Sequence, residues 1–224
     1  MTDKHGDVRR EYDSRQLQRE SLDTDPLRQF EHWLAEAQAA DLVDATAMSL
    51  ATADGQGQPS VRIVLLKHHD AAGFVFYTDY RSQKGRELAA NPQASVLFYW
   101  RELERQVRIN GAVEQVARAD SQAYFASRPL ESQISASASE QSAVIESRQA
   151  LAAKADRVRE TPELQAPEPW GGYRLVPREY EFWQGRENRL HDRFRYTQKV
   201  PADGQATAHT GAAWGDWLIQ RLQP

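Results

Sequence analysis

The segment from Glu181 to Arg193 contains the most chemically suggestive spacing in the chain, because Arg189, His191 and Arg193 recur at every second residue. On an extended backbone, side chains two residues apart lie on one face of the strand. Cationic groups gathered on one face repel one another unless water or an anion faces them. The spacing therefore predicts either a solvated, charged edge strand or a site that binds an anion.

A second pair of candidate cations lies in the run from Val61 to Lys67, which is apolar except for Arg62 and Lys67. A strand buried on both faces carries charges only where they are paired. These cations are therefore expected either at the surface ends of the strand or opposite an anion. Their odd separation directs the two side chains to opposite faces, so one pocket can take both only if the strand bulges or twists.

Helical segments supply the remaining candidates for anion binding. A helix that begins near residue 83 would place free N–H groups beside Lys84, a combination that suits an anion but is common in proteins. Tyr124, Arg128 and Ser132 follow at a spacing of four, so they share a face while the helix continues, although a proline follows Arg128. Two hydroxyls and a guanidinium would suit one phosphate group.

Composition limits the classes of function. The 224 residues carry a net charge of −4, contain no cysteine and show no apolar run long enough to span a membrane. We therefore expect a cytoplasmic protein with no disulfide, no membrane segment and no nucleic-acid partner. The group His68-His69-Asp70 lies in an expected turn and is more typical of a solvated loop than of a metal site, so no metal is predicted.

The elements that must position these side chains are mainly strands. Period-two patterns predict strands at 46–53, 60–67, 74–78, 94–100, 104–114 and 214–222. Helices are expected to begin at Pro26, near residue 83 and near Arg118, and another to span 144–160. The fold class predicted is mainly β with peripheral helices (α+β).

Domain organisation is expected to be simple. Residues 1–24 are polar and are predicted to form a mobile segment, and residues 25–224 are long enough for one domain with one core. The stretch 198–213 is poor in large apolar residues and is predicted to be a mobile loop.

The amino-acid sequence from Glu181 to Arg193 also resembles that of a known family. Glu-Phe-Trp-Gln-Gly at 181–185, followed by Arg-Leu-His-Asp-Arg at 189–193, resembles the C-terminal signature of the pyridoxamine/pyridoxine 5′-phosphate oxidases, and Leu103–Val107 matches the family wording as well. The resemblance extends from about Arg9 to Pro224. It implies a split β-barrel that binds FMN, and a homodimer with FMN in the interface contacted by both chains.

The resemblance also implies a reaction. Pyridoxamine 5′-phosphate or pyridoxine 5′-phosphate would lose a hydride from C4′ to the flavin N5, and molecular oxygen would reoxidise the flavin. The products would be pyridoxal 5′-phosphate, hydrogen peroxide and, from the amine, ammonia. The process would serve the biosynthesis and salvage of vitamin B6.

Residue roles follow from the same resemblance, position by position. Arg189 and His191 would lie near the reacting carbon as catalytic residues. FMN would contact Arg62, Ile63, Val64, Leu65, Leu66, Lys67, Tyr77, Thr78, Gln83, Lys84, Gln106, Gln141, Ser142, Trp183 and Arg193. The substrate would contact Arg9, Arg10, Glu11, Tyr12, Lys67, Tyr124, Arg128, Ser132, Arg189, Leu190 and His191, the first four as part of a lid that excludes water.

Three positions depart from the family pattern. Gln83 stands where the family has arginine, so it can donate a hydrogen bond but no charge, and we expect Gln83→Arg to strengthen FMN binding modestly. Ser135 and Ser137 replace glycine and tryptophan, a change without an explanation in the sequence.

Two other functions stay open: a related split-barrel flavin oxidoreductase with another substrate, and a non-catalytic binder of FMN or pyridoxal phosphate.

Overall fold

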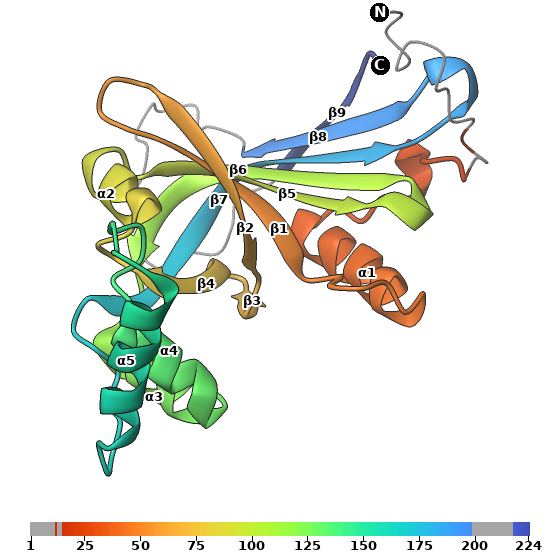
Figure 1. The fold of residues 1–224 in the computed structure, drawn as a ribbon. Coiled ribbons are helices and arrows are strands. Elements are labelled where there is room, and N and C mark those ends of the chain that lie inside the picture. The colour runs from red at the N-terminus through yellow and green to blue at the C-terminus, as the bar shows by residue number, and fades with distance from the viewer. Residues whose placement is uncertain (1–11, 13–14, 199–216) are drawn as a thin grey trace, which may run out of the picture. The chain divides into compact units, whose positions relative to one another are not determined.

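The computed structural model describes residue 12, residues 15–198 and residues 217–224 of the chain. Strands predominate in these ranges, and the helices lie at the periphery of the sheet (Figure 1). The mainly β fold class with peripheral helices is therefore confirmed. No helix in the described ranges is both long and apolar enough to cross a membrane.

The strands match most of the predicted runs. They are β1 (Ala47–Ala53), β2 (Pro59–Leu65), β3 (His68–Asp70), β4 (Gly73–Asp79), β5 (Gln93–Trp100), β6 (Arg105–Gln115), β7 (Trp170–Gln184), β8 (Asp192–Gln198) and β9 (Trp217–Leu222). The helices are α1 (Pro26–Ala39), α2 (Gln83–Ala90), α3 (Arg118–Ser127), α4 (Leu130–Ala138) and α5 (Arg148–Arg159), with short 3₁₀ turns η1 (Arg19–Ser21), η2 (Arg101–Leu103) and η3 (Glu187–Arg189).

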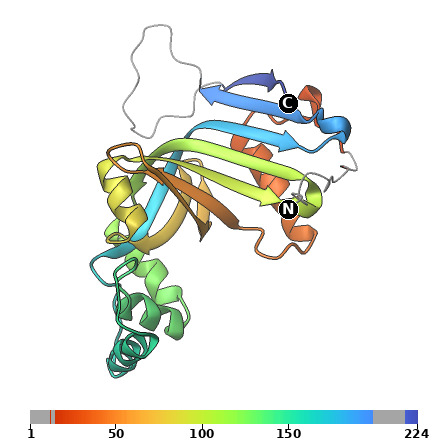
Figure 2. The same cartoon turned by 45° about the horizontal axis from the view of Figure 1, so that its top comes forward.

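Hydrogen bonding orders the strands as β2-β1-β5-β6-β7-β4-β3, with β8 added to β7 and β9 to β8. Strands β7 and β8 run antiparallel (Figure 2). Their register places Phe182 opposite Phe194 and Trp183 opposite Arg193. The β4–β7 pair is also antiparallel and places Tyr77 opposite Gly172. Strand β7 is thus joined to both of these neighbours by antiparallel pairing.

The chain divides into two compact units. Unit 1 comprises Met1–Met48, Val96–Ile109 and Arg178–Pro224, and unit 2 comprises Ser49–Ser95 and Asn110–Pro177. Strands β1, β5, β6 and β7 each contribute residues to both units. The single domain expected at residues 25–224 therefore stays a prediction.

Unit 1 has an aromatic core against which α1 packs. Helix α1 begins as the sequence predicted, with the Asp25 carboxylate accepting a hydrogen bond from the Leu27 N–H and a proline in the first turn. Trp33 on this helix meets the ring of Phe182 edge-on at 5.3 Å between centroids. In the N-terminal segment, Leu17 and Leu22 are buried, so the described part of that segment makes packing contacts. Whether the segment moves stays a prediction.

Unit 2 holds the shorter helices and a stack of aromatic rings. Phe125 of α3 and Trp170 of β7 are buried together, and Tyr77 and Tyr124 pack against them. The stretch 132–142, which resembles a linker in composition, is helical as far as Ala138. The hydroxyls of Ser135 and Ser137 donate to carbonyls four residues earlier in this helix. Helix α5 lies within the range 144–160 that the sequence predicted to be helical, and it buries no residue.

Three local predictions were wrong. Residues 68–70 form strand β3, paired with β4, because the turn that joins the two strands is confined to residues 71–72. The Val61–Lys67 run is exposed on one face, where Val61 and Ile63 keep 68% and 64% of their surface accessible. Arg189 and His191 do not share a strand face with Arg193, because η3 interrupts the chain and β8 begins only at Asp192.

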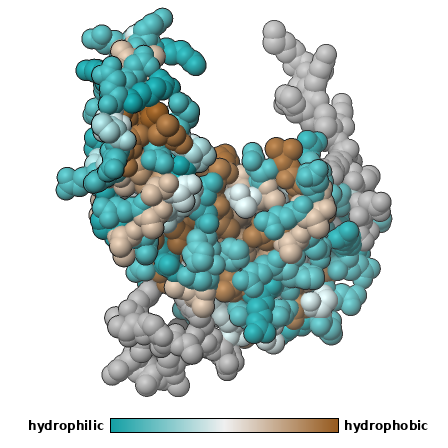
Figure 3. Space-filling view, turned by 90° about the horizontal axis from the view of Figure 1, so that it is seen from below, coloured by the Kyte–Doolittle hydropathy of each residue, from teal (hydrophilic) through white to brown (hydrophobic). Residues whose placement is uncertain are grey.

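Apolar side chains also reach the surface. Figure 3 shows them as separate brown areas among hydrophilic side chains on one face of the molecule. The exposed large apolar residues include Val43, Val144, Leu130 and Leu190. The predicted mobile loop at 198–213 and residues 214–216 of the predicted last strand lie outside the described residues, apart from Gln198 at the end of β8.

Candidate functional site

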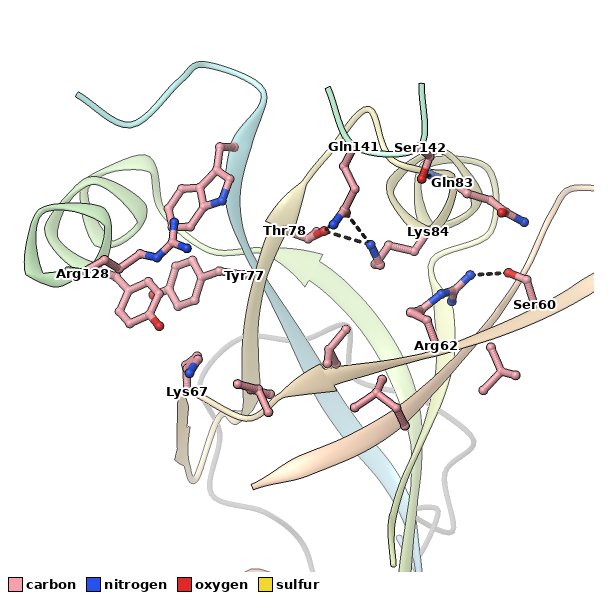
Figure 4. A pocket seen from close by; sticks show the side chains of 16 residues that line it. Ser60, Arg62, Lys67, Tyr77, Thr78, Gln83, Lys84, Arg128, Gln141 and Ser142 are labelled. Carbon is pink, nitrogen blue, oxygen red and sulfur yellow. Dashed lines mark hydrogen bonds between the residues drawn. The ribbon is translucent and has the colours of Figure 1, made fainter. Parts of the chain in front are cut away.

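Unit 2 contains a pocket of about 530 Å³ that collects most of the predicted anion-binding residues (Figure 4). Predicted residues that line it are Arg62, Ile63, Val64, Leu65, Lys67, Tyr77, Thr78, Gln83, Lys84, Tyr124, Arg128, Gln141 and Ser142. Ser60, Val61 and Trp170 also line it and were missed. Leu66 and Ser132 are absent from the lining, Leu66 because it is buried.

One end of the pocket is built around Lys84. Its ammonium donates to Gln141 Oε1 at 2.6 Å and to Thr78 Oγ1 at 3.1 Å (Figure 4). Burial, and then the nearby Arg62, lower the pKa of Lys84 to about 8. A buried ammonium held by neutral oxygens is a strong binding group for an added anion.

The start of α2 contributes to the same end of the pocket. Ser82 caps the helix by accepting from the Gly85 N–H, and the Gln83 N–H donates to Ser142 Oγ at 3.2 Å. Ser142 has a left-handed backbone with φ of 72°, which is uncommon for a residue other than glycine. Strained backbone of this kind is concentrated at ligand sites. The loop at residues 141–142 therefore contacts the start of α2, where the sequence predicted an anion site.

Arg62 points into this end from β2 and is held by four acceptors. Its Nη1 donates to the Leu50 carbonyl at 3.1 Å and to Thr52 Oγ1, and its Nη2 donates to Ser60 Oγ and to Glu87 Oε2 at 3.1 Å. Its side chain keeps only 20% of its surface exposed. The guanidinium is therefore fixed in direction before any ligand binds.

Arg128 and Lys67 occupy the opposite end of the pocket (Figure 4). Helix α3 stops at Ser127 and Arg128 is extended, so the helix is interrupted at the proline, and Tyr124, Arg128 and Ser132 do not share one helical face. The guanidinium of Arg128 lies over the Trp170 ring at 5.0 Å. Its Nη1 is buried and has no hydrogen-bond partner among the described residues, and burial lowers its pKa. A buried donor of this kind is satisfied when an anion binds.

Arg62 and Lys67 line one pocket, for which the sequence predicted a bulge or a twist of the strand. Strand β2 ends at Leu65, so Lys67 lies outside the strand. The alternation of side chains between the two faces of a strand therefore does not direct Lys67 away from Arg62. The Lys67 N–H donates to the Val75 carbonyl, which fixes the backbone there. Between the ends, Tyr77 stacks on Tyr124 at 4.0 Å between ring centroids.

Unit 1 holds the second group of predicted residues. His191 lies 4.6 Å from the Trp183 ring and 5.4 Å from the Tyr12 ring, centroid to centroid. Burial and then the arginines at 189 and 193 lower the pKa of His191, so the ring is mostly neutral near pH 7. The Arg186 N–H donates to its Nδ1 at 3.1 Å, which places the proton of the neutral ring on Nε2.

Gly185 leaves space for the ring of Tyr12. Its φ is not positive, but a Cβ at this position would come within 2.6 Å of the Tyr12 ring. Glycine is needed here for space, because Tyr12 packs where a side chain would lie. Tyr12 is the member of the predicted lid that the structure describes, and Arg9, Arg10 and Glu11 lie outside the described residues.

The remaining predicted residues of unit 1 are more exposed. Arg189 has an exposed side chain and a left-handed φ of 62°, and Leu190 is 69% exposed. Arg193 is held by Glu181, whose Oε1 accepts from its Nε at 2.8 Å. Gln106 is half-buried on β6.

Comparison with known proteins identifies the family. Residues 34–162 match the model described as pyridoxamine 5′-phosphate oxidase. Residues 170–224 match the model described as the pyridoxine 5′-phosphate oxidase C-terminal dimerisation region. The chain belongs to the pyridoxamine 5′-phosphate oxidase family. This assignment confirms the resemblance and supports FMN as the cofactor.

Relatives of this oxidase family cover nearly the whole chain. A pyridoxine/pyridoxamine 5′-phosphate oxidase of Burkholderia ambifaria is 50% identical over 220 residues, which are 97% of this chain and 98% of that protein. One of Prochlorococcus marinus is also 50% identical and covers 97% of this chain and 95% of its own.

Solved structures confirm the split-barrel fold. PhzG from Burkholderia lata, solved in complex with tetrahydrophenazine-1-carboxylic acid, is 32% identical, with a TM-score of 0.84 over 95% of this chain and 99% of that one. An FMN-binding protein from Nostoc punctiforme shares the fold at 17% identity, with a TM-score of 0.67 over 91% of this chain and 100% of that one. The chain is thus an oxidoreductase-family protein, and its substrate is a separate question.

The pocket fits the phosphate of FMN on its own chemistry. Arg62 and Lys84 supply two cations, and α2 begins at the same place. A phosphate ester carries a charge of about −2 near neutral pH and needs several donors. Gln83 lines the pocket without a charge, as the sequence indicated, and its amide donates to Glu87 at 2.9 Å.

Proposed function

We propose that the protein is an FMN-dependent oxidase that converts pyridoxamine 5′-phosphate and pyridoxine 5′-phosphate to pyridoxal 5′-phosphate, with oxygen as the acceptor. The observation that carries this proposal is the pocket of unit 2, which has a cationic group at each end. Arg62 and Lys84 form one group, and Lys67 and Arg128 form the other. Two phosphorylated ligands, a cofactor and a substrate, would account for both.

The substrate phosphate would bind at the Arg128 end. The unpartnered, buried Nη1 of Arg128 offers a charged donor, Lys67 adds a second cation, and the Tyr124 hydroxyl adds a directional donor. The stacked rings of Tyr77 and Tyr124 offer a flat surface beside these donors. Bound FMN would supply the hydride acceptor, and the chain's own residues would anchor and orient the substrate.

Arg189 and His191 would position the reacting end of the substrate. Since Nδ1 of His191 accepts from the Arg186 N–H, its Nε2 carries the proton and donates. In this state His191 orients the substrate by a hydrogen bond; accepting a proton would require it to lose the Arg186 contact. Arg189, exposed on a strained turn, would supply a cation beside it.

A homodimer would bring these residues to the cofactor. The match of residues 170–224 to a dimerisation region supports this assembly. As in the family that the sequence resembles, FMN would contact residues of both chains, with Trp183, Gln106 and Arg193 among them. The predicted lid at residues 9–12 would then cover the substrate.

The alternative is a related flavin oxidoreductase that acts on another substrate, and one observation supports it. PhzG is related to this chain at 32% identity and was solved with a phenazine carboxylic acid. A flavin enzyme with a non-phosphorylated aromatic substrate would need neither Lys67 nor Arg128 at the far end of the pocket. Retention of both cations favours the vitamin B6 phosphates.

The test is anaerobic mixing of the FMN-loaded protein with pyridoxamine 5′-phosphate while the flavin absorbance is followed. The expected result is bleaching, with colour restored by air and pyridoxal 5′-phosphate formed. The matched control is pyridoxamine without its phosphate, which should bleach the flavin far more slowly. An unchanged spectrum with both the pyridoxamine and pyridoxine phosphates would contradict the proposal and favour another substrate or a non-catalytic flavin binder.

A further inference from the structure

Glu87, the fifth residue of α2, has no role in the function proposed above. Its side chain is 8% exposed, yet it is a carboxylate in unit 2 next to the cationic end of the pocket. A buried carboxylate beside an anion site is unfavourable for the anion by charge alone. Its presence there therefore calls for a compensating role.

The hydrogen bonds of Glu87 show what that role is. The carboxylate accepts from Ser60 Oγ at 2.6 Å, from Thr52 Oγ1, from Gln83 Nε2 at 2.9 Å and from Arg62 Nη2 at 3.1 Å. Three of these four donors, those of residues 60, 62 and 83, belong to side chains that line the pocket. One carboxylate thus fixes three pocket-lining side chains at once.

The hydroxyls of Thr52 and Ser60 extend this control. Each donates to Glu87 and accepts from the Arg62 guanidinium, so Glu87 determines the direction of both O–H groups. Burial alone would raise the pKa of Glu87, but the hydrogen bonds from these four donors outweigh it and lower the pKa to about 2. The group is therefore ionised at every pH at which the protein would work.

We propose that Glu87 is a positioning residue for the phosphate end of the FMN site: it holds Arg62, Ser60 and Gln83 in the orientation that receives a phosphate. The proposal rests on the proposed function, because it takes Arg62 and Lys84 as the FMN phosphate contacts. Without the carboxylate, the Arg62 side chain loses its charged acceptor and the amide of Gln83 loses its partner. The side chains of Arg62 and Gln83 must then become ordered when FMN binds, and this entropic cost lowers the affinity for FMN.

The test compares two flavins that differ only in the phosphate. Apoprotein is titrated with FMN and with riboflavin, and the quenching of flavin fluorescence gives each dissociation constant. Glu87→Gln keeps the size of the side chain but directs an N–H₂ group toward donors. We expect the dissociation constant for FMN to rise about tenfold, the scale of one lost charged hydrogen bond, with that for riboflavin unchanged within about twofold.

Two further variants keep the test decisive. Thr52→Val is nearly isosteric and alters a buried residue outside the pocket lining, so it should shift the FMN constant in the same direction by a smaller factor, about threefold. Glu131→Gln is the matched control, because Glu131 also pairs with an arginine of unit 2, Arg159 at 2.7 Å, but lies on an exposed face of α4. It should change neither constant. Thr52→Val stands in if Glu87→Gln does not fold.

The outcomes separate this inference from the proposed function. If the parent shows no preference for FMN over riboflavin, the placement of the FMN phosphate at Arg62 and Lys84 fails. If the parent prefers FMN and Glu87→Gln keeps the same preference, the positioning role fails alone. Tighter FMN binding by Glu87→Gln would also overturn it, because the carboxylate would then act mainly by repelling the phosphate.

Discussion

The cationic side chains of the pocket differ in the groups that contact them, and these contacts decide how strongly each can bind an anion. Lys84 is buried against oxygens that carry no full charge, and Arg62 is held by one carboxylate, two hydroxyls and a carbonyl. Arg128 instead rests on an aromatic face and has an unpartnered Nη1. The three cations therefore differ in how strongly they need a ligand, and Arg128 needs one most.

Lys84 predicts a pH dependence of FMN binding. Its pKa of about 8 in the free protein means that the ammonium is charged below that pH and neutral above it. A dianionic phosphate binds the charged form, so FMN affinity should change little near pH 7, be about twofold lower at pH 8 and fall by up to about tenfold per pH unit above it. Titration of apoprotein from pH 7 to 9.5 would measure this.

Two controls accompany the Lys84 titration. Riboflavin has no phosphate, so its affinity should not follow the same profile. Lys84→Arg keeps its charge through the range and should remove the fall. A fall of the same size with riboflavin would assign the effect to another group.

Arg189 is the residue whose removal tests the reacting end of the substrate. Arg189→Ala is expected to lower kcat/KM by about a hundredfold, the scale for losing one directed charged donor, with FMN affinity unchanged. Steady-state kinetics with pyridoxamine 5′-phosphate would measure it. Arg178→Ala removes an exposed arginine from β7 and serves as the control. Parent values of both kcat and KM in Arg189→Ala would refute the assignment.

At the scale of elements, the ends of strands and helices decide the site. Strand β2 ends just before Lys67, and α2 begins just before Lys84. The turn η3 places Asn188 and Arg189 in left-handed backbone, with φ of 54° and 62°. Such backbone is uncommon outside glycine, and asparagine tolerates it better than most residues. The candidate catalytic segment is therefore a strained turn, where the sequence favoured an extended strand.

Gly85 in α2 gives an element-scale prediction. Helix propensity alone favours Gly85→Ala by about 1 kcal/mol. A Cβ at this position would lie 2.0 Å from the Tyr80 carbonyl oxygen, which is backbone and cannot rotate away. We expect the substitution to destabilise the fold by roughly 1–3 kcal/mol, as overpacking does, and to weaken FMN binding by moving Lys84.

Thermal unfolding and FMN titration would measure both effects. Gly55→Ala is the matched control, because the nearest atom to its added Cβ is 4.0 Å away. It should be neutral or slightly stabilising. Unchanged stability in Gly85→Ala would mean that α2 can shift without loss.

For the whole molecule, assembly is the open prediction. The chain has a mass of 25.5 kDa, and residues 170–224 match a dimerisation region. Light scattering of the purified protein should therefore give twice the chain mass. Since both chains are expected to contact FMN, dilution that separates the chains should release the flavin in parallel. A monomer that retains FMN would contradict this assembly.

The sequence alone determined the types of element and the identity of the family. Period-two and period-four patterns are local, so they located β1, β2, β4, β5, β6 and α1 within a few residues. The wording at 181–193 identified the family and thereby the fold and FMN. Local pattern also selected Arg62, Lys84 and Arg128 as anion-binding candidates, and they line one pocket.

Tertiary structure decided what local pattern cannot encode. The apolar strand at 61–65 appears buried in sequence but has an exposed face, because burial depends on which segments pack against it. Ser132 does not line the pocket, since the chain turns at Arg128 and starts a new helix. Glu87 gave no signal in sequence, because a helical glutamate is usually solvated. Its meaning depends on hydrogen bonds to residues up to 35 positions away, and only folding brings those together.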